Sequence, residues 1–283
     1  MNNITYEQSV NWLRTQDNYA ALVKLCYLDE DNFIAAKRFY GSEEFAEVKN
    51  YLKLNKGNKK LKILDLGCGN GIASYSFASL GHDVTAVDPD ASADVGLEAA
   101  KRLSLYVSNG SISITQAFAE SLPFADETFD IVYARQSLHH FSDLQQGVTE
   151  CSRVLKKHGL FFATREHIIS DKNQLQQFLE NHILHQLHGG ENAYLLKDYT
   201  LVIHKAGFKI LNCLGSFDSV INHYPTSNTE IKAFFSNVLE RKFGKLFKPI
   251  FIKSKLLETK FRQRLSHSDN APGRLYSFLC IKL

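Results

Sequence analysis

A short apolar segment that runs directly into three alternating glycines is the feature that most restricts how this chain can fold. Gly67, Gly69 and Gly71 follow the apolar residues 61–66, and Asp65 stands just before them. Glycine lacks a Cβ atom, so the backbone of such a turn can approach a ligand closely and direct its N–H groups at it. Apolar residues after Gly71 recur at helical spacing. The pattern predicts a strand, a ligand-binding turn and a helix; an ordinary strand-to-helix turn does not need three glycines behind an acid.

Beyond this turn, strand-like and helix-like segments alternate. The predicted strands are residues 61–66, 82–87, 111–115, 129–133, 160–164, 208–214 and 274–283, and the predicted helices between them are 72–80, 91–105, 143–155, 171–187 and 194–206. Such alternation is typical of a doubly wound sheet whose two faces are covered by helices. We therefore predict an α/β fold with a mostly parallel, seven-stranded, Rossmann-like sheet.

Four segments follow from this prediction. Residues 1–60 have helical periodicity and form a predicted N-terminal helical cap. Residues 61–215 form the ligand-binding α/β core, and residues 271–283 supply the last strand of its sheet. Because that strand is expected to pair inside the sheet, residues 216–270 become a helical, cationic insertion or lid rather than a separate domain.

The spacing of the glycines argues against a dinucleotide as the ligand. The dinucleotide fingerprint Gly-x-Gly-x-x-Gly would need a glycine where Ile72 stands. Asp65 is badly placed for a pyrophosphate but suits a ligand with an ammonium group. Asp88 ends the second strand, 17 residues after Gly71, and its carboxylate can accept hydrogen bonds from both hydroxyls of a ribose. An ammonium group, a ribose diol and no pyrophosphate describe S-adenosylmethionine (SAM).

Five motifs in the same order carry a family resemblance. They are residues 63–71, 86–88, 119–130, 138–141 and 153–160. Together they resemble the class I SAM-dependent methyltransferases, in particular the small-molecule subset that includes the ubiquinone and menaquinone enzymes. The resemblance covers residues 60–165 and, more loosely, the two C-terminal strands.

The resemblance implies SAM as the cofactor and a set of residues that bind it. Asp65, Gly67 and Gly69 would hold the methionine part, and Asp88 would hold the ribose. The full predicted set is Asp65, Gly67, Cys68, Gly69, Asp88, Pro89, Phe118, Ala119, Glu120 and Arg135. Phe118 departs from the family pattern, because an Asp often stands there and contacts the adenine amino group. A backbone carbonyl or Glu120 would have to replace that contact.

Two adjacent histidines follow the fourth predicted strand, at the edge where doubly wound sheets bind ligands. A hydroxyl acceptor must lose a proton when it is methylated, and histidine has an ordinary pKa suited to that task near neutral pH. We predict His139 and His140 as the candidate catalytic bases, with His139 preferred. The alternative is that one of them organises the loop through hydrogen bonds.

Polar residues after the fifth predicted strand and beside a Gly-Gly pair are predicted to bind the acceptor. They are Arg165, Glu166, His167, Glu191 and Asn192. A local salt bridge in a solvated turn is the alternative for the first three. His182, His185 and His188 lie at i, i+3 and i+6, a spacing that drifts round a helix, whereas zinc prefers i and i+4. The sequence therefore predicts no metal site.

Basic residues are concentrated in one segment. Residues 241–264 hold nine Lys or Arg and one Glu, while the other 259 residues hold 24 basic and 29 acidic side chains. Phe243, Phe247 and Phe251 recur every four residues within it, a pattern that suits an anionic membrane surface or an anionic, lipid- or nucleotide-linked acceptor. A lid helix packed on the body is the alternative, and the acidic remainder disfavours nucleic acid.

The five cysteines are widely spaced, without a Cys-x-x-Cys pair, which fits a reducing compartment. The chain shows no signal-peptide pattern and no apolar run of about 18–20 residues, so we predict a cytoplasmic protein. The resulting hypothesis is a SAM-dependent methyltransferase that acts on a small molecule, first of all on a hydroxyl oxygen of a sugar or natural product. Carbon methylation of a quinone-like ring, or a non-catalytic SAM-binding partner protein, are the alternatives.

Overall fold

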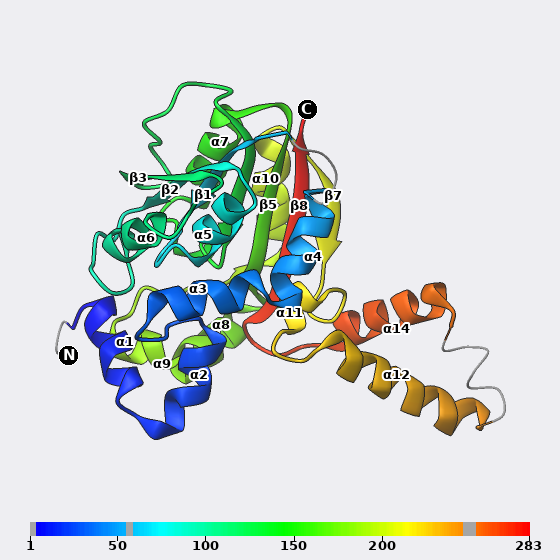
Figure 1. Ribbon diagram of the computed structural model, residues 1–283. Coiled ribbons are helices and arrows are strands. Elements are labelled where there is room, and N and C mark those ends of the chain that lie inside the picture. Colours follow the sequence, from blue (N-terminus) through cyan, green and yellow to red (C-terminus); the bar gives the residue numbers. More distant parts are fainter. Residues whose placement is uncertain (1–3, 55–58, 246–252) are drawn as a thin grey trace.

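One twisted sheet with helices on both faces forms the centre of the molecule (Figure 1). The computed structural model describes residues 4–54, 59–245 and 253–283. The strands of these ranges are β1 (Lys62–Leu66), β2 (Asp83–Asp88), β3 (Ser111–Gln116), β4 (Phe129–Arg135), β5 (Leu155–Ile169), β6 (Tyr194–Leu195), β7 (Phe208–Leu214) and β8 (Arg274–Lys282). Their order is β3-β2-β1-β4-β5-β8-β7, and the short β6 pairs with β5.

The sheet confirms the predicted α/β fold. β1 is parallel to β2 and β4, and only β8 is antiparallel to its neighbours, β5 and β7. The seven predicted strands are all present, and β6 is an additional strand of two residues. The strand order reverses between β1 and β4, and ligands of doubly wound sheets bind at the carboxyl ends of the strands at such a point.

Helices cover the sheet and cap one of its edges. They are α1 (Tyr6–Arg14), η1 (Asp17–Tyr19), α2 (Ala20–Leu25), α3 (Asn32–Tyr40), α4 (Glu43–Tyr51), α5 (Ile72–Ser79), α6 (Leu97–Ser104), η2 (Leu138–His140), α7 (Leu144–Val154), α8 (Lys172–Asn181), α9 (Ile183–Leu187), α10 (Leu196–Lys205), α11 (Val220–His223), α12 (Asn228–Phe243) and α14 (Lys255–Ser268). The helix predicted over 91–105 begins only at Leu97, and the one predicted over 171–187 is divided at His182, whose backbone is extended. The first of these corrections leaves residues 91–96, which follow β2, outside a helix.

Apolar side chains fill both faces of the sheet. One cluster includes Val148 and Cys151 of α7 and Tyr199 of α10, and the other includes Phe39 of α3 and Phe77 of α5. Strands covered on both faces are expected to be continuously apolar rather than alternating. The buried runs of β1 and β4 have this character.

The N-terminal cap is hydrogen-bonded to the glycine turn. The side chain of Asn32, at the start of α3, donates to the carbonyl oxygen of Asn70 at 2.7 Å. The side chain of Asn70 in turn donates to the carbonyl oxygen of Tyr27 at 2.8 Å. The cap therefore lies against the edge at which β1 ends (Figure 1).

The insertion before β8 projects away from the sheet as a pair of helices, α12 and α14 (Figure 1). The rings of Phe235 and Phe261 pack the two helices together, with centroids 4.9 Å apart. The predicted aromatic positions Phe247 and Phe251 lie outside the described residues. Within the described ranges, no helix is both long and apolar enough to cross a membrane.

Candidate active site

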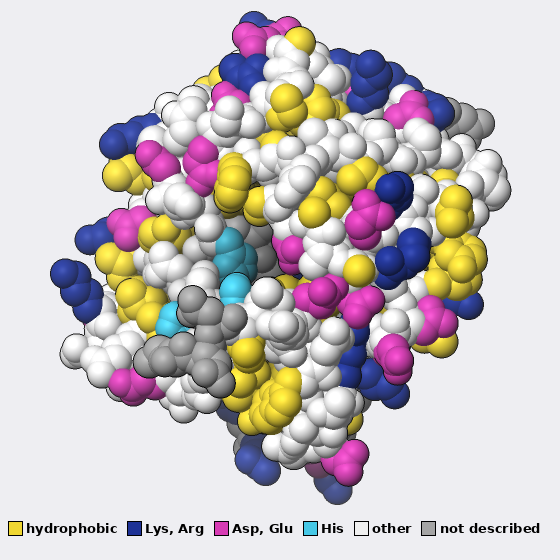
Figure 2. Space-filling view, turned by 90° about the vertical axis from the view of Figure 1, so that its left-hand side faces the viewer, with side chains coloured by type: hydrophobic (Ala, Val, Ile, Leu, Met, Phe, Trp, Pro, Cys, Tyr) yellow, Lys and Arg dark blue, Asp and Glu magenta, His cyan; other side chains and the backbone are white. Residues whose placement is uncertain are grey.

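A cavity of about 820 Å³ opens at the carboxyl ends of β1, β2 and β4. The glycine turn, the loop after β2 and a histidine-rich segment contribute to its lining. Figure 2 shows histidine side chains gathered in a hollow on this face of the molecule. The volume falls within the range of about 300–1,000 Å³ that is usual for small-molecule sites.

Gly67 has a geometry that other residues cannot adopt without cost. Its φ angle is +68°. A Cβ atom added there would lie 2.4 Å from the Cβ of Ser137. The backbone N–H groups of Gly67 and Cys68 both donate to the carbonyl oxygen of Val87, at 2.8 and 3.0 Å. These contacts bring the turn, β2 and the segment after β4 to one point.

Asp88 ends β2 and faces the turn. Its Oδ2 accepts from the N–H of Gly69 at 2.9 Å, and its Oδ1 accepts from the N–H of Asp90 at 2.9 Å. Burial raises the pKa of Asp88, and the two backbone hydrogen bonds oppose this rise. Because each carboxylate oxygen has two lone pairs, both oxygens can accept a further hydrogen bond from a ligand.

Asp65 is a buried carboxylate, 1% exposed, at the end of β1. The hydroxyl of Ser74 donates to its Oδ2 at 2.5 Å. Burial raises the pKa of Asp65 to about 6. Among the described residues, no Lys, Arg or His forms an ion pair with it. A buried charge without a partner is costly, so a cationic ligand group is the complement that this position lacks.

All ten predicted cofactor residues line the cavity. They are Asp65, Gly67, Cys68, Gly69, Asp88, Pro89, Phe118, Ala119, Glu120 and Arg135. Phe118 is 66% exposed and therefore lies at the mouth. The Oε1 of Glu120 accepts from the N–H of Asp143 at 3.1 Å, which holds this side chain toward α7.

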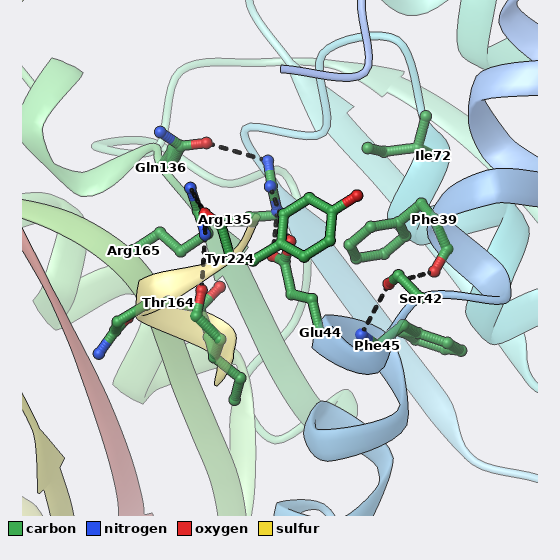
Figure 3. A network of polar contacts seen from close by, with 12 residues as sticks. Phe39, Ser42, Glu44, Phe45, Ile72, Arg135, Gln136, Thr164, Arg165 and Tyr224 are labelled. Atoms are coloured by element: carbon green, nitrogen blue, oxygen red, sulfur yellow. Dashed lines mark hydrogen bonds and ion pairs between the residues drawn. The ribbon is translucent and has the colours of Figure 1, made fainter. Parts of the chain in front are cut away.

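Arg135 is held by the N-terminal cap (Figure 3). Its Nε and Nη2 donate to the two carboxylate oxygens of Glu44, in α4, at 2.7 and 3.2 Å. Its Nη1 donates to the side chain of Gln136 at 3.0 Å. The charge of Arg135 is therefore already neutralised, and the residue joins the cap to β4 while it lines the cavity.

His139 projects from η2 and is fixed by a carboxylate behind it. Its Nδ1 lies 2.8 Å from Oε2 of Glu166, whose Oε1 accepts from the N–H groups of Ser137 and Leu138 at 3.2 Å. Its Nε2 lies 3.6 Å from Oε2 of Glu191. Burial lowers the pKa of His139, but the interactions with the two carboxylates outweigh burial and raise it to about 9.

The structure brings only some of the predicted acceptor residues into the cavity. His167, Glu191 and the candidate base His140 line it, together with His139. The side chain of His140 is 45% exposed, and its Nδ1 lies 3.1 Å from the carbonyl oxygen of Gly190. Burial lowers the pKa of His167 to about 3. Burial raises the pKa of Glu191, but the interactions with His139, His140 and His182 outweigh burial and lower it to about 2.

Arg165, Glu166 and Asn192 do not line the cavity, so the prediction of acceptor contacts is not supported for them. β5 continues to Ile169, so the first two lie inside the strand rather than in a loop after it. The Nη1 of Arg165 donates to the carbonyl oxygen of Ile221 at 2.7 Å, and Glu166 lies behind His139. The side chain of Asn192 accepts from the next backbone N–H at 2.9 Å.

Several cavity residues were not predicted, because they come from helices far away in the sequence. Tyr6 and Glu7 of α1, together with His182, Leu184 and His188, form the wall opposite the sheet. The Nδ1 of His188 lies 2.9 Å from the carbonyl oxygen of Ile4, 184 residues away. No local pattern distinguishes these residues from an ordinary helix surface.

The described part of the predicted lid does not line the cavity. None of the described residues of 216–270 belongs to its lining. The physical reason is the strand order, since β4, β5 and β8 separate β7 from β1. An insertion that leaves the sheet after its outermost strand is directed away from the cavity. The cavity is covered by α1 and α9 instead.

Comparison with known proteins defines the class. Residues 64–163 match the family described as a methyltransferase domain. Solved structures share the fold: that of YcgJ from Bacillus subtilis has a TM-score of 0.53 at 21% identity, covering 84% of this chain and 98% of that one. The [4+2]-cyclase SpnF has a TM-score of 0.54 at 18% identity, covering 90% and 84%. The chain therefore contains a class I SAM-dependent methyltransferase domain.

Two sequence relatives are more specific. The uncharacterized methyltransferase YcgJ of Bacillus subtilis (strain 168) is 34% identical over 122 residues, 43% of this chain and 46% of YcgJ. The ubiquinone biosynthesis O-methyltransferase of Rhizobium leguminosarum bv. trifolii is 31% identical over 134 residues, 47% of this chain and 52% of that enzyme. The chain spans about half the length of the curated relatives it matches.

SAM is the cofactor of this class, and the residues present fit it. The unpaired carboxylate of Asp65 matches the ammonium group of the methionine part. The remaining acceptor sites of Asp88 match the ribose hydroxyls. Because Gly67 has no Cβ atom, the turn can lie against Ser137, another residue of the cavity lining.

Proposed function

We propose that this protein is a cytoplasmic enzyme that transfers the methyl group of SAM to a hydroxyl oxygen of a small molecule, with a sugar or natural product as the acceptor class. One observation carries the proposal: the residues that fit SAM and a polar cluster of histidines and Glu191 line the same cavity. Polar groups at the acceptor end suit a ligand rich in hydroxyls better than an apolar one.

SAM supplies an electrophilic methyl group on a sulfonium. The acceptor oxygen forms a bond to this methyl group while the bond from sulfur to the methyl group breaks, and the acceptor loses its proton. The role of the chain is mainly positioning, which can lower a barrier by about 7–11 kcal/mol. Within the histidine pair we assign the proton to His140, because burial lowers its pKa, whereas the two carboxylates raise the pKa of His139 to about 9 and keep that ring protonated near neutral pH.

The proposal is tested by incubating the protein with SAM and a panel of glycosides, phenols and quinols, and by measuring S-adenosylhomocysteine. We expect turnover with a hydroxyl acceptor, and a drop in kcat of about 10²–10⁴-fold when the base of the pair is replaced by Gln. His204→Gln, on the exposed side of α10, is the matched control. Full activity in both His139→Gln and His140→Gln would refute a role for the pair.

Two other functions have an observation in their favour. The relatives include ubiquinone biosynthesis O-methyltransferases, so a quinone-like ring is an alternative acceptor, methylated at oxygen or carbon. SpnF, a cyclase, shares the fold, so SAM binding without methyl transfer is the other alternative. SAM binding with no S-adenosylhomocysteine formed on any acceptor would favour the latter.

We also propose that the α12–α14 pair brings the protein to an anionic acceptor or an anionic membrane that carries it. The exposed cations on the described part of the segment are Arg241, Lys242, Lys245, Lys253, Lys255, Lys260 and Arg264. Arg262 is not among them, because it is buried and paired with Glu258 at 2.9 Å. Cations on a projecting pair of helices can approach a surface without involving the cavity.

A further inference from the structure

Three side chains that are far apart in the sequence converge at the acceptor end of the cavity. His139 comes from η2, His167 from β5, and Glu191 from the loop after α9. One ligand atom from each lies within 4.8 Å of the other two. The Nε2 of His139 and the Oε2 of Glu191 are 3.6 Å apart, which is too long for a hydrogen bond. Two ligands at about 2.0–2.2 Å on one tetrahedral ion would be about 3.3 Å apart.

Both imidazoles are oriented from behind. The Nδ1 of His139 is held by Glu166 at 2.8 Å, and the Nδ1 of His167 is held by the carbonyl oxygen of Gly273 at 2.8 Å. Because a carbonyl oxygen only accepts, the Nδ1 of His167 carries a hydrogen, and its Nε2 can keep a lone pair. Histidines that bind metals are typically fixed in this way, with the second ring nitrogen donating to a carboxylate or carbonyl.

A fourth side chain without a hydrogen-bond partner lies beside the cluster. The Nδ1 of His182 is buried, has no hydrogen-bond partner among the described residues, and is 3.8 Å from Oε1 of Glu191. Glu166 and Glu191 also place two carboxylates around the imidazoles, and a divalent cation would balance both. A buried ring nitrogen beside the Glu191 carboxylate is placed to serve as a further ligand.

We propose that His139, His167 and Glu191 bind one divalent transition-metal ion through the two Nε2 atoms and the carboxylate, with His182 within reach as a further ligand. Two imidazoles and one carboxylate favour Zn²⁺ or Fe²⁺ over Mg²⁺ and Ca²⁺, which prefer oxygen ligands. Three protein ligands leave a coordination position for a ligand in the cavity.

The ion would also have a role in the proposed methyl transfer, and this role rests on the proposed function. A divalent cation at this place would orient an acceptor hydroxyl and lower its pKa. His139 would then hold the ion, and the half-exposed His140 would be the base of the pair. The binding site itself stands on the geometry alone and does not require methyl transfer.

Metal binding is measured on the tag-free, full-length protein after treatment with a chelator. We expect Co²⁺ to bind with a stoichiometry of one and to give visible absorption bands, and Zn²⁺ to displace it. Glu166→Gln, which removes the support behind His139, should weaken binding about 10–100-fold. Glu191→Gln and His167→Asn remove a ligand each and should weaken it more. His204→Asn, an exposed histidine of α10 outside the cavity lining, is the matched control and should bind Co²⁺ as the wild type does.

Binding of S-adenosylhomocysteine and the far-ultraviolet circular dichroism of each variant show whether it is folded. The absence of stoichiometric Co²⁺ binding by the wild type would overturn the metal site, and so would unchanged affinity in folded Glu191→Gln and His167→Asn. A protein that binds Co²⁺ but forms no S-adenosylhomocysteine with any acceptor retains the site and refutes the methyl transfer. The reverse result refutes only the metal site.

Discussion

Gly67 lies where β1, the segment after β4 and the cofactor cavity meet. Gly67→Ala adds a Cβ atom 2.4 Å from that of Ser137 at a φ of +68°, so the turn must shift. We expect affinity for S-adenosylhomocysteine, measured by calorimetry, to fall at least tenfold, and the free energy of unfolding to fall by more than the roughly 1–2 kcal/mol that a left-handed residue costs.

Gly207 provides the matched control for this substitution. Its φ is +85°, but a Cβ atom there meets nothing within 4 Å, and Gly207 is not part of the cavity lining. Gly207→Ala should lower the free energy of unfolding only by the roughly 1–2 kcal/mol of a left-handed residue. It should leave affinity for S-adenosylhomocysteine unchanged. Equal affinities in the two variants would mean that Gly67 does not shape the cofactor site.

Asp65 makes cofactor binding depend on pH. Burial raises its pKa to about 6, so below that pH the carboxyl is increasingly protonated and cannot balance the ammonium group of the ligand. We expect affinity for S-adenosylhomocysteine to fall as the pH drops from 7 to 5, and Asp65→Asn to bind weakly throughout. Without the ligand, folding stability depends on pH in the opposite direction. Asp65 stabilises the folded state below its ordinary pKa, and that contribution is lost as the pH rises through about 6.

Calorimetric titrations between pH 5 and 8 check this prediction. Asp88 also has a raised pKa, so Asp65→Asn should still lose part of its affinity for S-adenosylhomocysteine at low pH. Affinity of the wild type that is constant down to pH 5 would contradict a role for the Asp65 carboxylate in holding the ammonium group.

At the scale of elements, the pair of Glu44 and Arg135 fastens α4 to the end of β4. The side chain of Glu44 is fully buried and that of Arg135 nearly so, and their two hydrogen bonds are 2.7 and 3.2 Å long. Glu44→Gln leaves the guanidinium without its counter-charge, which for a buried pair costs about 3–5 kcal/mol. We expect the free energy of unfolding, measured in urea, to fall by this amount. It should fall little when Glu44→Leu and Arg135→Met are combined. If Glu44→Gln lowers the free energy of unfolding by less than about 1 kcal/mol, the cap is held mainly by its apolar contacts.

β5 shows where prediction of elements from the sequence ends. Its predicted part, residues 160–164, is apolar, but the strand continues through Arg165, Glu166 and His167. Charged residues in succession are typical of a loop. Here each has a partner from another element: carbonyl groups near α11, the backbone of η2, and Gly273. The strand could not be extended from the sequence because those partners become neighbours only after folding.

At the scale of the whole molecule, the cavity and the cationic helix pair point in different directions. Replacing the exposed Lys255, Lys260 and Arg264 by Gln should weaken binding to anionic vesicles roughly a hundredfold, since each cation near such a surface contributes about 1 kcal/mol. Vesicle sedimentation measures this. Affinity for S-adenosylhomocysteine should not change, because these residues are not part of the cavity lining. If the wild-type protein does not bind anionic vesicles, the membrane is excluded and only an anionic acceptor remains as the target of the helix pair.

The order of elements along the chain and the cofactor end of the cavity were determined by the sequence itself. The glycine turn, Asp65 and Asp88 are close in sequence to the strands that position them, so local spacing carries their geometry. Periodicity likewise predicts strands and helices, because burial on one or both faces is imposed at every second or every third to fourth residue.

The acceptor end was decided only by the tertiary structure. Glu191, His167 and His139 belong to three elements, and α1 closes the cavity from the other end of the chain. The direction of the insertion depends on the strand order, which places β7 outermost. Contacts between residues that are distant in sequence depend on how whole elements pack, and no local pattern encodes that packing.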